Sequence, residues 1–379
     1  MNKRIFELDL ARIIIVLTLP FIHIMEFWGD MYGYADMISL NATSILNTIC
    51  EILCIFVAPT FMVCMGINMS FTRKSTYKDF IRRGFILLAV ELLLNIIRYE
   101  IPGLISLAVA TSSEAKELVA SSMRLGSINS DILALAGLAF IVFGLFKKFN
   151  FKPRTILIIS TILYFIDLII NETIMPSLAV NMNFDLSNLL GNFIYIDENS
   201  TFPIMEWLMF ISTGYCLGVK IKVQDEDARK TMFKKILIIT VFVFAFCLSK
   251  AIMYEVNPIE SLNKAGLARS MTPLCLIGEI SASLLFLSLI YTIYNLLHLK
   301  SNDKFNNWAA MFSNNITYFY CVQWTIVGWG MMFGIALLLG SKALSMLGVL
   351  VCYVVICIIS YYLGGWLHTK IKTFNLNKH

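Results

Sequence analysis

Ionisable side chains cluster in the first long apolar segment of the chain: Glu7, Asp9, Arg12, His23 and Glu26. A helix over this segment would place Arg12 and His23 on one face, about 16 Å apart along its axis, because eleven residues make just over three turns. Asp9 lies one turn before Arg12 and can pair with it, and Glu26 lies one turn after His23 and can fix its tautomer. A histidine held in this way is suited to general acid–base catalysis, because imidazole titrates close to neutral pH.

The same residues also have a structural interpretation. Asp9 and Arg12 can mark one membrane interface and Glu26 the other, and a neutral histidine can be a buried hydrogen-bonding group of a helix bundle. The combination in one helix favours a reaction centre, in which we assign His23, Glu26 and Arg12 to catalysis. Pro20 lies between Arg12 and His23 and predicts a kink in the helix, because its ring removes one backbone hydrogen bond.

Other carboxylates also fall inside apolar runs. They are Glu51, Glu91, Asp167, Glu206 and Glu279. Each of them can equally be a structural hydrogen-bonding group between helices. The nine cysteines have no zinc-ligand spacing with a nearby histidine, so we expect no metal site and interpret most of these cysteines as small buried hydrophobes.

The composition indicates which kind of fold positions these side chains. Hydrophobic residues make up 58% of the 379 positions and charged residues only 15%, and the mean hydropathy is +0.75. Soluble domains are about 45–50% apolar and about 25% charged. These values exclude a soluble enzyme, a disordered chain and a disulfide scaffold, and the long unbroken apolar runs exclude a β-barrel. The sequence predicts an all-α, polytopic integral membrane helical bundle.

Apolar runs of membrane-spanning length predict about ten crossings. They lie at roughly 10–28, 45–70, 82–99, 131–146, 155–171, 204–219, 236–253, 272–297, 309–339 and 345–367. With both termini in the cytoplasm, 22 of the 30 lysine and arginine residues fall on the cytoplasmic side, as the positive-inside rule requires. Residues 1–379 form a single multi-pass domain in this interpretation, and residues 103–123 form an amphipathic helix at the outer interface.

The pattern of motifs resembles a known group of enzymes. The stretch Glu7-Leu8-Asp9-Leu10-Ala11-Arg12, followed by an apolar helix that reaches His23, is similar to the opening of membrane-bound acyltransferases. The second crossing ends in Ala58-Pro59-Thr60-Phe61 and Gly66, which resembles the heparan-alpha-glucosaminide N-acetyltransferase branch, related to acyltransferase family 3. The resemblance continues along the chain in three further motifs: Arg82-Arg83-Gly84, Asp131-Ile132-Leu133 with Gly137-Leu138, and Asn314-Asn315-Ile316-Thr317 with Gln323-Trp324.

The resemblance implies transfer of an acetyl or short acyl group from cytosolic acyl-CoA to a hydroxyl or amine acceptor, such as a sugar, at or across the membrane. His23 would act as the general base, or would carry the acyl group covalently; the sequence leaves both mechanisms open. Acetyl-CoA would be the co-substrate, without a metal. We expect a glycan or other small acceptor and membrane lipids as partners, no nucleic acid, and the plasma membrane as location; a homodimer is left open.

Basic residues on the cytoplasmic side are candidates for holding the anionic donor, because arginine binds phosphate oxygens in a bidentate manner. They are Arg12, Arg73, Lys78, Arg82 and Arg83. Much of this set also serves the topology signal. For the acceptor or the acetyl carbonyl we select Glu51, Asn315, Gln323 and Trp324, for which packing in a polar helix interface is the alternative.

A secondary transporter is the competing function. Prolines within crossings can break helices, and carboxylates in the membrane can relay protons. The sequence shows no inverted or parallel repeat, which argues against a transporter.

Overall fold

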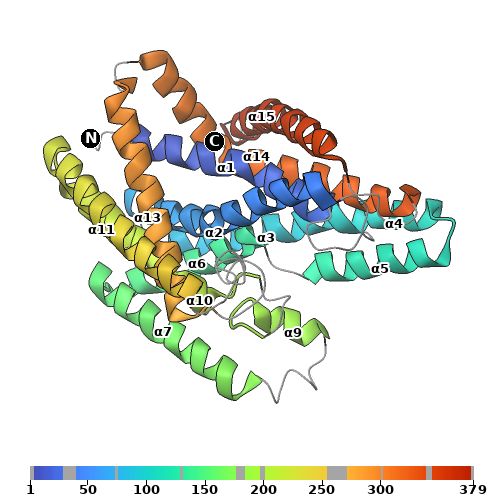
Figure 1. Cartoon of the computed structure of the whole chain (residues 1–379), viewed down its shortest axis with the longest axis horizontal. Coiled ribbons are helices and arrows are strands. Elements are labelled where there is room, and N and C mark those ends of the chain that lie inside the picture. The colour runs from blue at the N-terminus through green and yellow to red at the C-terminus, as the bar shows by residue number, and fades with distance from the viewer. Residues whose placement is uncertain are drawn as a thin grey trace. The chain divides into compact units, whose positions relative to one another are not determined.

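The computed structural model describes residues 4–28, 40–72, 76–128, 131–175, 184–196, 201–253, 271–299, 302–338 and 344–376. Every regular element in these ranges is a helix (Figure 1), which confirms the all-α prediction. The helices are α1 (Phe6–Phe27), α2 (Leu40–Phe71), α3 (Tyr77–Asn95), the π-helix η1 (Ile96–Glu100), α4 (Ile101–Val109), α5 (Ser113–Ile128), α6 (Ile132–Lys148), α7 (Pro153–Thr173), α9 (Phe184–Gly191), α10 (Ile204–Val223), α11 (Glu226–Met253), α13 (Pro273–Leu296), α14 (Asp303–Leu338) and α15 (Met346–Leu376).

Each of the ten apolar runs corresponds to a helix in the described ranges. Seven helices there are long and apolar enough to cross a membrane: α1, most of α2, α7, α10, α11, α13 and α15. Large apolar side chains on these helices are exposed, among them Phe242, Leu347 and Tyr362, as expected for surfaces that face lipid. The chain is therefore a multi-pass helical membrane protein, and the number of ten crossings with cytoplasmic termini stays a prediction.

The chain divides into two compact units. The first contains Met1–Arg4, Cys54–Leu92 and Ile128–Ile293, and the second contains Ile5–Leu53, Leu93–Ser127 and Tyr294–His379. Each unit is assembled from segments that are distant in sequence. The single domain over residues 1–379 stays a prediction.

Small residues let the helices of the first unit pack at close range. A Cβ atom on Gly66 would lie 2.0 Å from the carbonyl oxygen of Ile211, and one on Gly214 would lie 2.0 Å from that of Val63. The backbones of α2 and α10 therefore touch, which only glycine allows. The other side of α10 packs against α7, where the hydroxyl of Ser160 lies 2.6 Å from that of Ser212.

Two of the motifs identified in the sequence have structural roles in the first unit. Gly84 of α3 and Gly137 of α6 face each other, and a Cβ on Gly84 would lie 2.6 Å from the carbonyl oxygen of Gly137. Asp131 caps α6, since its side chain accepts a hydrogen bond from the backbone N–H of Ile132. These contacts account for Gly84, Asp131 and Gly137 without a role in chemistry.

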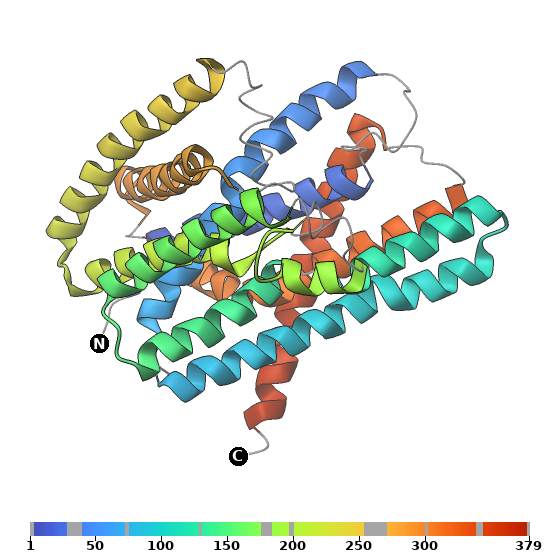
Figure 2. The ribbon, with the colours of Figure 1, turned by 90° about the horizontal axis from the view of Figure 1, so that it is seen from below.

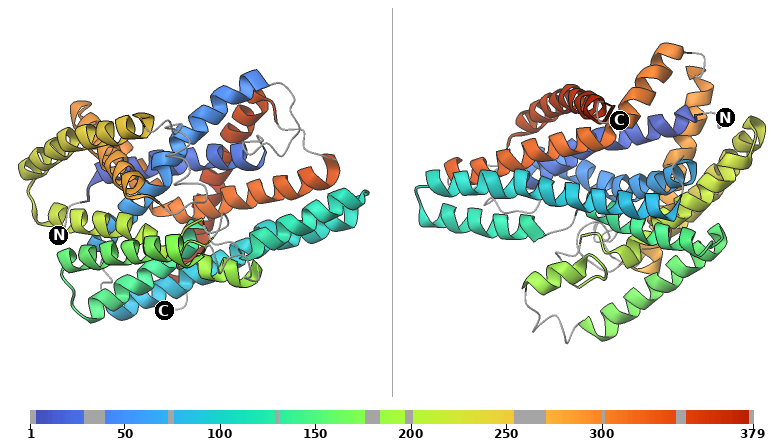
Figure 3. Two further views of the ribbon diagram at one scale, coloured as in Figure 1. Left: turned by 60° about the horizontal axis from the view of Figure 1, so that its bottom comes forward. Right: turned by 180° about the vertical axis from the view of Figure 1, so that it is seen from behind.

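In the second unit α14 packs against α1, α15, η1 and α4 (Figures 1 and 3). The α1–α14 contact includes a hydrogen bond from the indole N–H of Trp28 to the carbonyl of Val327. On α15, Gly364 leaves room for the backbone of Phe319, which would lie 3.0 Å from an added Cβ. The helix that carries His23 is thus fixed against α14.

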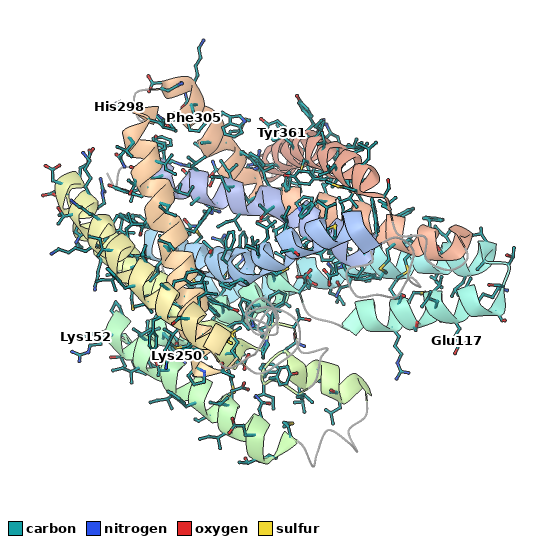
Figure 4. The ribbon with its side chains drawn as sticks, in the orientation of Figure 1. Glu117, Lys152, Lys250, His298, Phe305 and Tyr361 are labelled. Atoms are coloured by element: carbon teal, nitrogen blue, oxygen red, sulfur yellow. The ribbon has the colours of Figure 1, made fainter. Side chains whose placement is uncertain are left out.

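The region predicted as one helix over residues 103–123 is a helical hairpin (Figure 2). The chain runs from α3 through η1 into α4, turns at Ala110–Ser112, and returns as α5. Ser112 ends the continuity because its hydroxyl accepts a hydrogen bond from the N–H of Ala115 and so caps a new helix. The single-helix prediction was therefore wrong. Buried Val119 contributes to an apolar cluster with Tyr99 and Met332, whereas Glu117 points away from α5 (Figure 4).

Candidate functional site

The first part of the site is a polar network between α1 and α14. Arg12 lies 3.8 Å from Asp9, which confirms the predicted pair. The hydroxyl of Ser313 joins the two residues: it accepts a hydrogen bond of 2.8 Å from Arg12 and donates one of 2.6 Å to Asp9. Asp9 is buried, while the Arg12 side chain keeps 22% of its surface exposed. A charged arginine that stays partly accessible can still reach an anionic ligand.

The second part of the site is centred on His23. Its Nδ1 lies 3.1 Å from Oε1 of Gln323, a residue of α14 that is completely buried. Because an amide oxygen only accepts hydrogen bonds, Nδ1 carries the proton and donates it. The imidazole therefore keeps its lone pair on Nε2. For Glu26, which is half-buried on α1, the role in fixing the tautomer stays a prediction.

Aromatic rings hold the plane of the imidazole. His23 stacks on Trp324, with ring centroids 3.8 Å apart and an interplanar angle of 19°. The indole N–H of Trp324 donates to the hydroxyl of Tyr320 one turn earlier, at 2.7 Å. Tyr320 in turn meets the imidazole edge-on, at a centroid distance of 6.5 Å. His23, Gln323 and Trp324 thus come together in one unit, although the sequence assigned them to different roles.

Gln323 has a further property that bears on chemistry. Its amide nitrogen, Nε2, has no hydrogen-bond partner among the described residues, and the whole residue is buried. An unsatisfied buried donor costs about 1–3 kcal/mol. Such a donor beside a candidate base can serve a ligand oxygen that develops negative charge.

The other residues predicted to bind acceptor or donor come from several elements. Asn315 lies on α14 beside Gly365 of α15, where its Nδ2 would be 3.7 Å from an added Cβ. Glu51 belongs to α2 in the second unit. Arg73 lies outside the described residues. The remaining donor candidates, Lys78, Arg82 and Arg83, are exposed on α3 in the first unit.

Additional positive charge lies near the end of α6 in the first unit. The ammonium of Lys147 lies 4.7 Å from the ring centroid of Phe80, and Arg83 lies over Phe140 at 4.6 Å. Burial, with a smaller contribution from nearby Lys222, lowers the pKa of Lys147. These cations add to the basic set at the start of α3.

Two of the intramembrane carboxylates in the first unit have structural partners. Asp167 accepts hydrogen bonds from the backbone N–H of Tyr195 and from the amide of Asn171. Glu206 accepts one from the backbone N–H of Met271 at 2.9 Å. Asp167 thus holds the segment before α10 against α7, and Glu206 holds the segment before α13 against α10. Among the described residues, no group of histidine, cysteine, aspartate and glutamate side chains is arranged to hold a metal ion.

Sequence reasoning missed Arg98, which lies near the outer end of the predicted third crossing, 82–99, and was not selected as a site residue. Arg98 is only 2% exposed, and its guanidinium carbon lies 4.5 Å from the centroid of the Trp324 ring. The available signal was the apolar run that continues on both sides of Arg98. A charge within such a run marks a functional residue more often than a loop residue.

Comparison with known proteins gives one family. The model of the heparan-alpha-glucosaminide N-acetyltransferase catalytic family matches residues 4–249. This range includes α1 with Arg12 and His23 and ends before α14. No curated protein and no solved structure matches the chain significantly.

Proposed function

Because the chain belongs to the heparan-alpha-glucosaminide N-acetyltransferase catalytic family and is thus a membrane acetyltransferase, we propose that it acetylates a sugar from acetyl-CoA. In this proposal His23 is the general base, and the acceptor presents an amine or a hydroxyl group. The family assignment favours this function over the secondary transporter.

The observation that carries the proposal is the environment of His23. The side-chain oxygen of Gln323 accepts a hydrogen bond from Nδ1–H of His23, so Nε2 offers its lone pair, and Trp324 fixes the plane in which that lone pair points. A base with a fixed tautomer and a fixed plane is what general base catalysis requires, and it contributes about 10²–10⁴-fold.

The reaction then proceeds in one transfer. Nε2 of His23 takes the proton from the acceptor oxygen or nitrogen, which forms a bond to the acetyl carbon. The amide N–H of Gln323 donates a hydrogen bond to the carbonyl oxygen as negative charge develops there. The bond between carbon and sulfur breaks, and His23 returns its proton to the departing thiolate, which leaves as coenzyme A. The products are the acetylated acceptor and the free thiol.

Arg12 is proposed to meet the donor at the other end of α1. It lies about 16 Å from His23 along the helix axis, a distance that an extended pantetheine arm can span. Ser313 and Asp9 hold the guanidinium in place, and part of the Arg12 side chain stays exposed. Lys78, Arg82 and Arg83 of the first unit are proposed to attract the phosphates of acetyl-CoA from the cytoplasm.

Acetyl transfer by the purified full chain in liposomes tests this proposal. Acetyl-CoA with a labelled acetyl group is supplied with glucosamine, a simple amino sugar, or with methyl glucoside as a hydroxyl probe. We expect label in the acetylated sugar and one equivalent of free thiol for each acetyl group transferred. We also expect acetyl-CoA to raise the unfolding temperature, because a ligand that binds the folded state stabilises it.

A transporter would behave differently in the same vesicles. It would accumulate labelled glucosamine without covalent change, and acetyl-CoA would leave the unfolding temperature unaltered. That combination would contradict the proposed function.

A further inference from the structure

Arg98 is delivered to the site by an unusual helical turn. The π-helix η1 (Ile96–Glu100) lies between α3 and α4 and contains Arg98 and Tyr99, both of them buried. A π-helix carries more residues per turn than an α-helix and therefore redirects the side chains that follow, which is one reason why such turns are frequent at functional sites. The turn directs the guanidinium of Arg98 inward, whereas an uninterrupted α-helix would direct it differently.

The backbone of η1 is fixed against α14 within the second unit. The π-turn shifts backbone hydrogen bonds, and the carbonyl of Ile97 accepts one from the indole N–H of Trp329 at 2.8 Å. A Cβ on Gly328 would lie 2.5 Å from the carbonyl oxygen of Arg98. Gly328 thus allows the two backbones to touch, and Trp324 lies one turn before it on the same face of α14.

The guanidinium of Arg98 is held in a defined position. Its Nε donates a hydrogen bond of 3.0 Å to the side-chain oxygen of Asn95, which is also buried. Its carbon lies 4.5 Å from the centroid of Trp324, within the range of a cation–π contact. The same indole stacks on His23 at 3.8 Å. Trp324 therefore connects Arg98 to the imidazole.

We propose that Arg98 is a positioning residue of the acetyltransferase site: it holds the Trp324 indole, and the indole fixes the plane of His23. This inference rests on the proposed role of His23 as the base. Arg98 itself needs no contact with the acetyl group or the acceptor. Its contribution is to keep the lone pair of Nε2 aligned when the proton is transferred, where small displacements cost rate.

Substitution of Arg98 by methionine tests the proposal, because methionine keeps the length of the side chain and loses the planar cation. We expect R98M to lower kcat for acetyl transfer from acetyl-CoA to glucosamine about tenfold or more and to change the KM for acetyl-CoA less than about twofold, since alignment acts in the transition state. R124Q is the matched control, because Arg124 is an exposed arginine of α5 in the same unit. It should leave both constants unchanged.

A double-mutant cycle separates positioning through Trp324 from an independent effect. If Arg98 acts through the indole, R98M should lower kcat much less in a W324L background than in the wild type, because the connecting ring is already lost. An equal fold-loss in both backgrounds would overturn the proposal. Asn95→Ala provides a milder variant in case R98M folds poorly, and it should lower kcat in the same direction with the same dependence on Trp324.

Fluorescence distinguishes this proposal from the function on which it rests. The emission of Trp324 in the wild type is obtained by subtracting the spectrum of W324F. In the R98M background it is obtained by subtracting the spectrum of the R98M/W324F double variant. It should change between wild type and R98M and stay constant in R124Q. An unchanged spectrum would refute the contact between Arg98 and Trp324, whether or not His23 is the base. A changed spectrum with normal kcat would also refute the positioning role.

Discussion

At the scale of single residues, His23 depends on partners from other helices. Contacts within α1 were predictable, because residues three or four apart meet on one helix face; the Asp9–Arg12 pair is an example. The contact of His23 with Gln323 was not, because it requires knowledge of how α14 packs on α1. The motif resemblance identified Gln323 as a candidate, but only the packing brings it to the imidazole.

The unsatisfied amide of Gln323 gives the first prediction. Gln323→Met removes the acceptor for Nδ1 and the free donor while nearly keeping the volume. We expect kcat to fall about 10²–10³-fold, the usual cost of losing a donor to a developing oxyanion. The unfolding temperature should change little, because removal of the unpaired amide nitrogen offsets the loss of the acceptor for Nδ1–H of His23. Steady-state kinetics and thermal unfolding measure the two effects.

The control for this prediction is Asn315→Met, on the same helix but directed toward Gly365 of α15. It should lower kcat far less than Gln323→Met. If Gln323→Met unfolded at a much lower temperature and retained kcat, its amide would be structural and the proposed hydrogen bond to the acetyl oxygen would be wrong.

At the scale of helices, the apolar runs predicted position and type well, since the bilayer requires about twenty apolar residues per crossing. The turn at Ala110–Ser112 and the π-helix η1 were not predicted. The N-cap at Ser112 is a local sequence signal, but an interpretation based on hydropathy does not take helix caps into account. The π-turn depends on tertiary contacts, such as the one from Trp329 to Ile97, that no local pattern contains.

The close approach of α2 and α10 gives the second prediction. Gly214→Ala would place a Cβ 2.0 Å from the carbonyl oxygen of Val63, so the helices must separate. We expect a loss of about 1–3 kcal/mol or more, because overpacking forces backbone shifts. Thermal unfolding in detergent should show a clearly lower midpoint.

Gly334 of α14 provides the matched control, because nothing lies within 4 Å of an added Cβ there. Gly334→Ala should keep or slightly raise the midpoint, since alanine favours helix over glycine by about 1 kcal/mol. Equal effects of the two substitutions would contradict the close packing of α2 on α10.

At the scale of the whole molecule, composition alone predicted a helical membrane protein, and the distribution of charge predicted its orientation. The two compact units were not predicted, because each is built from segments far apart in sequence. The separation also divides the proposed site residues: Arg12 and His23 belong to one unit, whereas Arg82 and Arg83 belong to the other.

The orientation gives the third prediction. With 22 of 30 basic residues on the cytoplasmic side, both termini should lie in the cytoplasm. A tag with a protease cleavage site, placed after His379, should be protected from protease added outside intact cells and should become cleavable after permeabilisation. Cleavage from outside intact cells would overturn the topology and the side from which acetyl-CoA enters.

The basic residues at the start of α3 give the fourth prediction. Substitution of Arg82 and Arg83 by glutamine should raise the KM for acetyl-CoA more than it lowers kcat, because contacts remote from the reacting carbon act equally in the ground and transition states. Added salt should produce a similar increase in the wild type, since both side chains are exposed. An unchanged KM would mean that Arg82 and Arg83 serve only the membrane topology. Lys234→Gln on α11 is the control for a general loss of cytoplasmic charge.

The central claim, that His23 is the base of an acetyl transfer, is tested most directly by the rate of His23→Ala. Acetyl transfer from acetyl-CoA to glucosamine should fall at least 10²-fold, while acetyl-CoA still raises the unfolding temperature of the variant. His298→Asn is the control: His298 is exposed and follows the end of α13 (Figure 4), and asparagine tolerates its positive φ of 49°. This variant should retain full rate. Retention of more than about a tenth of the wild-type rate by His23→Ala would contradict the claim.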